Sequence, residues 1–554
     1  MDLLIDLFGY LSIVVHGLTI LAQSIALGGV LFLALLARPL APRLGTAGAA
    51  VVQGTQRIAA WGAVALLLCE ATTVALQTAV LVGTVDLSVT DVLAAQFAIA
   101  GLIKMAIAGV IAALLFVRAA RAPVPLLAGL ALVELAAATL TTHAVARLDD
   151  RVPLLVVEWL HQFGAAIWIG GIPCFLLALR RVEGGAAWRL VGARFSRMSM
   201  AGVACILASG TTMFWFYVGN LQGFYGTAYG VMVGAKIAMF LLLLALGGMN
   251  FLLVERLRAN PATPVLRLRR FAEVEIGIGV SIFFAAASLT SVPPAVDLTQ
   301  DRVSWQEIVE RNTPEWPRLS SPDHDALALP ELQAKLDVEA AHRRAAPQAA
   351  FVPGSGDLPP RNAADIAWSE YNHHWAGLLV VAIGLLALGQ RAGLRWARHW
   401  PLLFAGLGVF LFFRSDPETW PLGDIGFLES FRDVEVLQHR FFVLLILVFA
   451  AFEWRVRATA WDNRHAALVF PLLCAGGGAM LLTHSHAIAN LKDQLLIELT
   501  HTPLALAGIV AGWSRWLELR LDPRTDGTAV RIAGWVWPAC LLFCGLLLLS
   551  YREA

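Results

Sequence analysis

Charged residues are scarce in this chain of 554 residues. Asp, Glu, Lys and Arg together make up 15% of it, whereas apolar residues make up 58% and the mean hydropathy is +0.69. Soluble domains usually carry about 25% charged residues, so this composition excludes a soluble globular protein. The formal net charge of +1 gives no indication of a nucleic-acid partner. We therefore expect an all-α integral membrane protein whose surroundings are the lipid bilayer.

Other sequence features are also missing. The six cysteines lie singly within apolar runs and form no CxxC pair, so we interpret them as small packing residues and not as disulfide partners or thiolate ligands. The N-terminus has no basic segment and no small-residue cleavage site, so its first apolar run is expected to be retained as a span. The chain also lacks a GxxxxGK[ST] sequence for binding ATP.

Long apolar runs dominate what is present. Runs of about 20 residues, the length that crosses about 30 Å of hydrocarbon, recur roughly 14 times. This pattern predicts a polytopic bundle of about 14 transmembrane helices. The predicted spans lie near residues 8–37, 58–83, 92–117, 124–143, 153–179, 198–219, 229–254, 272–293, 368–389, 399–413, 435–454, 465–485, 494–514 and 532–550.

Arginines mark alternate connections between these spans. Short loops rich in Lys and Arg usually face the cytoplasm, and seven consecutive loops fit one topology that places both termini on the outer side. The arginine-rich loops lie within residues 38–57, 118–121, 180–197, 256–270, 391–398, 455–464 and 515–531.

One connection is long and polar. Residues 294–367 are rich in Pro, Asp and Glu, with short helical patterns near 303–311 and 329–345. We expect this segment to lie over the outer mouth, between an eight-span membrane domain (1–293) and a six-span, His-rich membrane domain (368–554).

Histidines collect in one leaflet of the predicted topology. Of thirteen, only His399 and His465 fall at cytoplasmic ends, while His324 and His342 fall in the long loop. Polar groups in lipid are costly and usually face a bundle interior or a pathway, and imidazole is the commonest metal ligand. The remaining nine are therefore candidate metal ligands. They are His16, His143, His161, His373, His374, His439, His484, His486 and His501.

Six of the nine come from four spans of the second half, which predicts a convergent outer site. Helical spacing places Glu435 beside His439 and Glu498 beside His501, and a carboxylate or carbonyl on the second ring nitrogen would fix the tautomer of a ligating histidine. Met480, four residues before His484, would add a thioether that favours Cu(I).

The first half has its own polar group. In "VVEWLHQFGAAIWIGGIP", Glu158 and His161 share the outer half of a span, and nearby glycines allow close helix approach. His16, His143 and His161 could form a second site. Four further ionisable residues, two of each sign, suggest neutralising pairs, with a structural or a conducting role. They are Glu70, Lys104, Glu134 and Lys236.

Three stretches carry a family resemblance. "WLHQFGAAIWIGGI", "RFSRMSMAGVACILASGTTMFW" and "TAYGVMVGAKIAMFLLLLALGGMN" resemble the core of the CopD family of bacterial inner-membrane copper proteins, over roughly residues 150–293. The second half, with "SEYNHHWAGLLV" and "LTHSHA", resembles the C-terminal membrane extension of the longer members. The matching positions are His161, Arg194, Phe195, Ser196, Gly210, Tyr229, Gly230, Lys236 and Asn250.

The resemblance implies copper handling between periplasm and cytoplasm, with a periplasmic copper carrier as partner, and leaves Cu(I) or Cu(II) open. The outer side, on which the loop charges place both termini, is then the periplasm. Without an ATP-binding motif, gradients or intracellular copper sinks would have to drive movement. Two alternatives use the same outer histidines. One is a membrane oxidoreductase with haem b, for which the few inner histidines argue against two stacked haems and leave a single outer haem open. The other is a membrane copper enzyme. Glycine-rich helix faces would also permit a homodimer.

Overall fold

The computed structural model is built from helices. It describes residues 2–85, 87–117, 123–298, 302–322, 334, 337–338, 341, 363–416, 419–432, 434–459, 461, 463–483 and 491–553. Within these ranges no strand occurs, and the only β-type pairing is an isolated bridge between Thr419 and Ile425. The prediction of an all-α protein is confirmed for the described chain.

The helices follow the predicted spans. Ten of the described helices are long and apolar enough to cross a membrane, and three shorter apolar helices cover residues 124–139, 402–414 and 466–481. The remaining predicted span, 435–454, falls within the 25-residue helix Val434–Ala458. The chain is therefore a multi-pass membrane protein, while the number of spans and the side on which the termini lie stay predictions.

Contacts divide the chain into two compact units, which are described separately. Unit 1 comprises residues 1–224, 232–300 and 482–485, and unit 2 comprises residues 225–231, 301–481 and 486–554. The described residues 302–322 and most of the predicted six-span half thus fall in the same unit.

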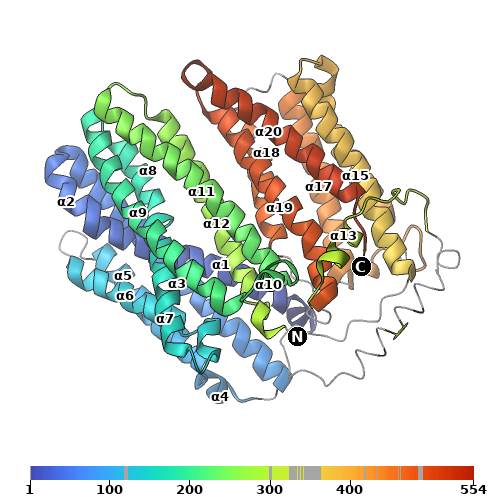
Figure 1. The fold of residues 1–554 in the computed structure, drawn as a ribbon, viewed down its shortest axis with the longest axis horizontal. Coiled ribbons are helices and arrows are strands. Elements are labelled where there is room, and N and C mark those ends of the chain that lie inside the picture. Colours follow the sequence, from blue (N-terminus) through green and yellow to red (C-terminus); the bar gives the residue numbers. More distant parts are fainter. Residues whose placement is uncertain are drawn as a thin grey trace. The chain divides into compact units, whose positions relative to one another are not determined.

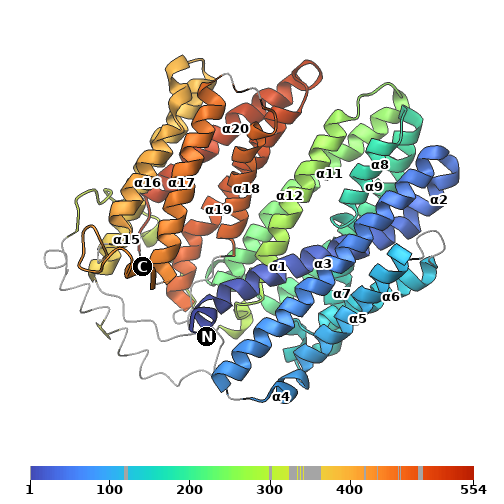
Figure 2. The ribbon, with the colours of Figure 1, turned by 180° about the vertical axis from the view of Figure 1, so that it is seen from behind.

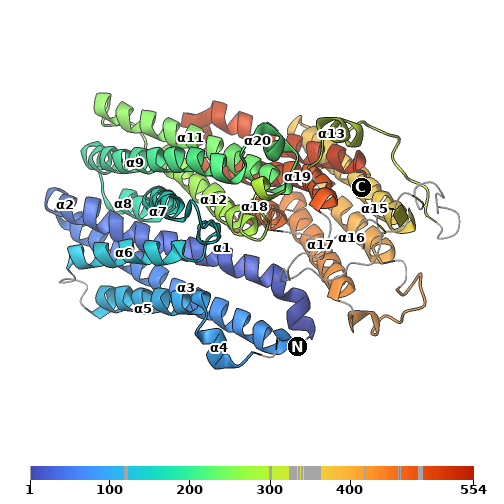
Figure 3. The same ribbon diagram turned by 60° about the horizontal axis from the view of Figure 1, so that its bottom comes forward.

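Unit 1 is built on α1, which packs against α3, α7 and α12 (Figure 1). α3 also packs on α5 and α5 on α6, so these helices lie side by side, as Figure 3 shows. Residues 225–231, at the end of α10 and the start of α11, count with unit 2. The elements are α1 (Asp2–Phe32), the π-helical η1 (Leu33–Ala37), α2 (Arg38–Leu40), η2 (Ala41–Arg43), α3 (Thr46–Val85), α4 (Val89–Leu93), α5 (Gln96–Val117), α6 (Val124–Thr139), η3 (His143–Ala146), α7 (Arg151–Trp168), α8 (Ile172–Arg181), α9 (Gly185–Tyr217), α10 (Leu221–Tyr225), α11 (Ala228–Ala259), α12 (Leu266–Leu289) and η4 (Ala295–Asp297).

Small residues let the helices of unit 1 approach closely. A Cβ on Gly170 would lie 1.9 Å from the carbonyl oxygen of Ser24, and one on Gly164 would lie 2.7 Å from that of Gly202. Only glycine fits such contacts, which bring α7 against α9 and the turn after α7 against α1. The glycine-mediated approach expected from the sequence is present.

Unit 2 pairs α15 with α20 and α16, α18 with α19, α19 with α20, and α16 with α17 (Figure 2). Its apolar core includes Trp400, Phe470 and Trp537. The guanidinium of Arg457 lies 4.6 Å from the centroid of the Trp400 ring and forms a 2.5 Å ion pair with Glu453. A buried charge is thus held by aromatic faces and a carboxylate. The elements are α13 (Trp305–Arg311), α15 (Ala363–Arg391), η5 (Arg395–His399), α16 (Leu402–Arg414), η6 (Ser430–Arg432), α17 (Val434–Ala458), η7 (Ala466–Leu468), α18 (Val469–Leu481), α19 (Leu491–Arg520) and α20 (Pro523–Leu549).

Candidate functional site

In unit 1, His161 of α7 lies against α9 and near a lysine of α11. Its Nδ1 is 3.0 Å from the hydroxyl oxygen of Ser209. That hydroxyl donates to the carbonyl of Cys205 at 2.6 Å, so its oxygen accepts from the His161 Nδ1–H and the lone pair of the imidazole stays on Nε2. Lys236 acts electrostatically on His161 and also on Glu158, the carboxylate one turn earlier on α7.

His143 belongs to the same cluster through Tyr217. The charge of Glu158 acts on the phenol of Tyr217, and the Tyr217 ring lies edge-on to the His143 ring, with centroids 6.4 Å apart. Nε2 of His143 is buried without a hydrogen-bond partner, and burial lowers the pKa of His143. The structure thus brings His143 and His161 into one polar group.

His16 of α1 has different neighbours. The charge that acts on it belongs to Lys104 of α5, whose Nζ lies 2.6 Å from Oε1 of Glu70 in α3. Both members of this ion pair are buried, and Glu134 of α6 is fully buried nearby. The four ionisable residues singled out in the sequence therefore do not form two simple pairs: Glu70 pairs with Lys104, and Lys236 faces Glu158.

In unit 2, residues from three segments meet at His373. The ring of His373 in α15 stacks on the ring of Tyr551 with centroids 3.9 Å apart. The His501 ring of α19 lies 6.4 Å from the His373 ring, nearly perpendicular to it, and 6.2 Å from that of Tyr551. Two of the predicted ligands, which are distant in sequence, therefore lie side by side.

The backbone fixes the tautomer of both histidines in the same way. Nδ1 of His373 lies 2.8 Å from the carbonyl oxygen of Ser369, and Nδ1 of His501 lies 3.0 Å from that of Ile497, each four residues earlier in its own helix. A carbonyl can only accept, so in each neutral ring Nδ1 carries the hydrogen and Nε2 carries the lone pair. This is the arrangement in which a carbonyl orients a metal-ligating imidazole.

The segment after α20 completes this cluster. The Glu553 carboxylate accepts hydrogen bonds from the Ser369 hydroxyl at 2.6 Å and from the Tyr551 phenol. Its charge acts on both His373 and His501. Burial and the neighbouring Glu553 raise the pKa of Tyr551, so the phenol stays protonated and donates. The sequence analysis missed Tyr551 and Glu553, because nothing in their spacing connects the chain end to these helices.

His374 is engaged on both sides of its ring. The backbone N–H of Arg318 donates to Nδ1 at 2.7 Å, and Nε2 donates to the carbonyl oxygen of Tyr551 at 2.8 Å. Both ring nitrogens are therefore used by the backbone. In this arrangement His374 fixes the position of Tyr551 beside His373 and presents no lone pair to a metal.

His439 of α17 has a carboxylate partner of its own. Its Nδ1 lies 2.6 Å from Oδ1 of Asp416, which follows α16. Burial alone would raise the pKa of Asp416, but its hydrogen bond to His439 and the charges of His439 and Arg440 outweigh this, so the pKa lies below its usual range. The sequence analysis had named Glu435 for this role, and the side chain of Glu435 is outside the described residues.

The remaining predicted residues are placed as follows. Glu498 is buried and accepts a 3.0 Å hydrogen bond from Thr502, so the carbonyl of Ile497, and not Glu498, holds the second nitrogen of His501. Met480 lies in α18. His484, His486, His324 and His342 lie outside the described residues. Among the residues that the structure describes, no group of three or more His, Cys, Asp or Glu is placed to hold a metal ion.

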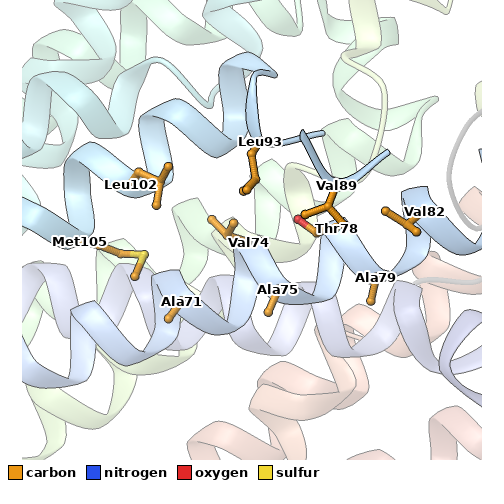
Figure 4. Close-up of a pocket in the computed structure, with 10 residues that line it drawn as sticks. All are labelled: Ala71, Val74, Ala75, Thr78, Ala79, Val82, Val89, Leu93, Leu102 and Met105. Carbon is orange, nitrogen blue, oxygen red and sulfur yellow. The ribbon is translucent and has the colours of Figure 1, made fainter. Parts of the chain in front are cut away.

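A groove of about 470 Å³ lies along α3, α4 and α5, and none of these histidines lines it (Figure 4). It is lined by apolar side chains such as Val74, Leu93, Leu102 and Met105, with Thr78 as its one hydroxyl. Such a lining suits lipid chains and supplies no metal ligand set.

Comparison with known proteins supports one family. Residues 189–289 match the family model described as Copper resistance protein D. This part of the chain is therefore similar to the CopD family. The copper transport protein CutJ of Bacillus subtilis (strain 168) is 31% identical over 163 residues, which cover 29% of this chain and 29% of the relative. No solved structure matches.

Several residues that carried the resemblance make defined contacts. In the CopD segment, Arg194 donates to the carbonyl of Leu35 in the π-helical turn at 3.0 Å, and Asn250 donates to Oε1 of Glu275 at 2.5 Å. A Cβ on Gly210 would lie 3.9 Å from the His161 ring. The segment thus supports the polar group around His161 from α9 and leaves out the whole of unit 2's histidine cluster.

Proposed function

We propose that this protein binds copper and transports it across the bacterial inner membrane, between periplasm and cytoplasm. The CopD segment, the similarity to a protein named for copper transport and the many apolar helices support this proposal. A periplasmic copper carrier would deliver the metal to the outer side. Neither match is named for haem, so the oxidoreductase alternative has no support.

One observation carries the choice of site. His373 and His501 come from different helices, lie with their rings 6.4 Å apart, and each has Nδ1 bound to a carbonyl of its own helix. Two imidazoles with lone pairs on Nε2 are suitable ligands for copper. We infer that these two histidines bind copper in unit 2.

The charge at this place favours a cation. Glu553 contributes a carboxylate that acts on both rings, with Arg311 as the opposing charge near His501. In unit 1 a lysine acts on His161 and another on His16, which disfavours a metal cation there. His143 and His161 are therefore assigned a secondary role, and His16 none.

The test is copper content measured on the purified full-length protein. Wild type is expected to bind copper in stoichiometric amount by elemental analysis, without the Soret band of haem in its optical spectrum. The double variant His373→Ala/His501→Ala should lose this copper.

The matched control is His399→Ala. Nδ1 of His399 accepts a hydrogen bond from the indole of Trp454, near the C-terminal end of α17. No metal-binding role is proposed for His399. It should keep the copper. Equal loss in both variants, or a Soret band with stoichiometric iron, would contradict the proposed site. Copper uptake into vesicles then separates a transporter from a fixed copper site.

A further inference from the structure

The carboxyl group of Glu134 is isolated in the interior of unit 1. Glu134 lies in α6, is 0% exposed, and has two buried carboxyl oxygens without a hydrogen-bond partner. An ionised carboxylate left without hydrogen bonds in an apolar interior costs many kcal/mol, whereas the neutral acid avoids most of this cost. The structure therefore favours a protonated Glu134 while Glu70 and Lys104 are paired with each other.

The charges of neighbouring residues can change the protonation state of Glu134. The charges that act on Glu134 are those of Lys104 on α5 and Glu70 on α3, and Lys104 also acts on His16 of α1. From α7, which also packs on α6, the titratable residues face elsewhere, since Glu158 and His161 both interact with Lys236.

The Glu70–Lys104 pair is already neutral, and its atoms are 2.6 Å apart. A second carboxyl is therefore unnecessary for neutralising Lys104. If α6 needed only packing at this point, an apolar residue of similar size would be less costly than a buried acid without partners. A function that requires gain and loss of charge explains the carboxyl better than a structural one.

We propose that Glu134 is a proton-exchange site within the membrane, and that its proton moves when copper is transported. The O–H bond of the Glu134 carboxyl breaks and the proton passes to water, without electron transfer. The carboxylate left behind shares the positive charge of Lys104 with Glu70, which limits the cost of ionisation. The link to copper rests on the proposed function, whereas proton exchange at Glu134 does not.

The first test measures the carboxyl group itself. Infrared difference spectra of the lipid-reconstituted protein, recorded between two pH values, should show the C=O band of a protonated carboxyl that disappears on ionisation. This band should be absent in Glu134→Gln. It should remain in the control Glu275→Gln, which alters another buried acid, one that is hydrogen-bonded to Asn250. A pH-dependent band that is the same in wild type and Glu134→Gln, or the lack of any such band, overturns the proposal.

The second test measures coupling in proteoliposomes that contain a pH-sensitive dye. Copper added outside should produce a proton flux in wild type and in Glu134→Asp, and a flux at least tenfold lower in Glu134→Gln, with copper content unchanged. If wild type transports copper without proton movement, the coupling is wrong and the copper function stands. If wild type contains no copper, the copper function fails while the infrared test still decides whether Glu134 exchanges a proton.

Discussion

Two histidines of unit 1, His16 and His161, lie near lysines. Lys104 acts on His16, and Lys236 acts on His161. Each lysine also interacts with a carboxylate, so these regions are networks of alternating charge with histidine at their edge. A metal cation entering such a network would be repelled by a neighbouring ammonium.

Unit 2 provides the opposite environment. His373 and His501 lie with Glu553, and carbonyls of their own helices hold the Nδ1 hydrogens. Histidines that look equivalent in the sequence are therefore divided by the charge next to them. In the proposed assignment, the neighbouring charges distinguish a proton-handling region from a metal-binding one, and the histidine itself does not.

The largest effect is expected where the charge network of unit 1 is broken. Glu70→Ala removes the carboxylate that lies 2.6 Å from the buried Lys104 ammonium, a contact that the Glu134 carboxyl does not make. Loss of one member of a buried pair costs about 3–5 kcal/mol, so the thermal unfolding temperature in detergent should fall strongly.

The control replaces both charges. Glu70→Leu/Lys104→Met leaves no uncompensated charge, and buried pairs exchanged for apolar residues are often neutral in stability. This variant should recover most of the lost unfolding temperature. A double variant as unstable as Glu70→Ala would show that the pair is needed for more than its charge balance.

A smaller effect tests the environment of unit 2. Glu553→Gln keeps the size of the side chain and one hydrogen-bond acceptor but removes the negative charge near His373 and His501. Copper affinity should fall about tenfold, which corresponds to about 1.4 kcal/mol, as measured by competition with a chelator.

Glu315 supplies the control for this variant. It forms a 3.0 Å ion pair with Arg552 of the same C-terminal segment, but its side chain is 63% exposed. Such exposed pairs contribute little, so Glu315→Gln should leave copper affinity unchanged. An equal fall in both variants would mean that the C-terminal segment acts through its position and not through the charge of Glu553.

The helices could be predicted because membrane insertion imposes a local rule. Each span must satisfy its own backbone and be apolar over about 20 residues, and within the described residues each predicted span overlaps at least one helix. The fourth span was placed at 124–143, but α6 ends at Thr139 and His143 begins a short 3₁₀ turn. The Thr-rich end "TLTTHA" satisfies carbonyls through its own hydroxyls and breaks the helix early.

The site could be predicted only by residue type. Histidine spacing predicted that His373 and His501 belong together, but their partners Tyr551 and Glu553 come from a segment with no pattern of its own. Asp416 likewise reaches His439 across 23 positions of sequence. Such pairings depend on how helices dock, and a one-dimensional pattern carries no information about them.

The smallest effect concerns the histidine with its own carboxylate, His439. Because the pKa of Asp416 is lowered in the folded protein, the ionised form stabilises the fold above the unfolded value of about 3.9, and this contribution is lost as pH falls through the folded pKa. Asp416→Asn should lower stability at neutral pH by about 1 kcal/mol, since His439 is partly exposed. It should also make the unfolding temperature less dependent on pH at acidic pH.

Asp424→Asn is the control, because it alters an exposed acid of the same loop. It should leave the pH profile as in wild type. An unchanged profile in Asp416→Asn would mean that the charge of Asp416 does not contribute to holding His439, so that a neighbouring carboxylate would not set this histidine apart from those near lysines.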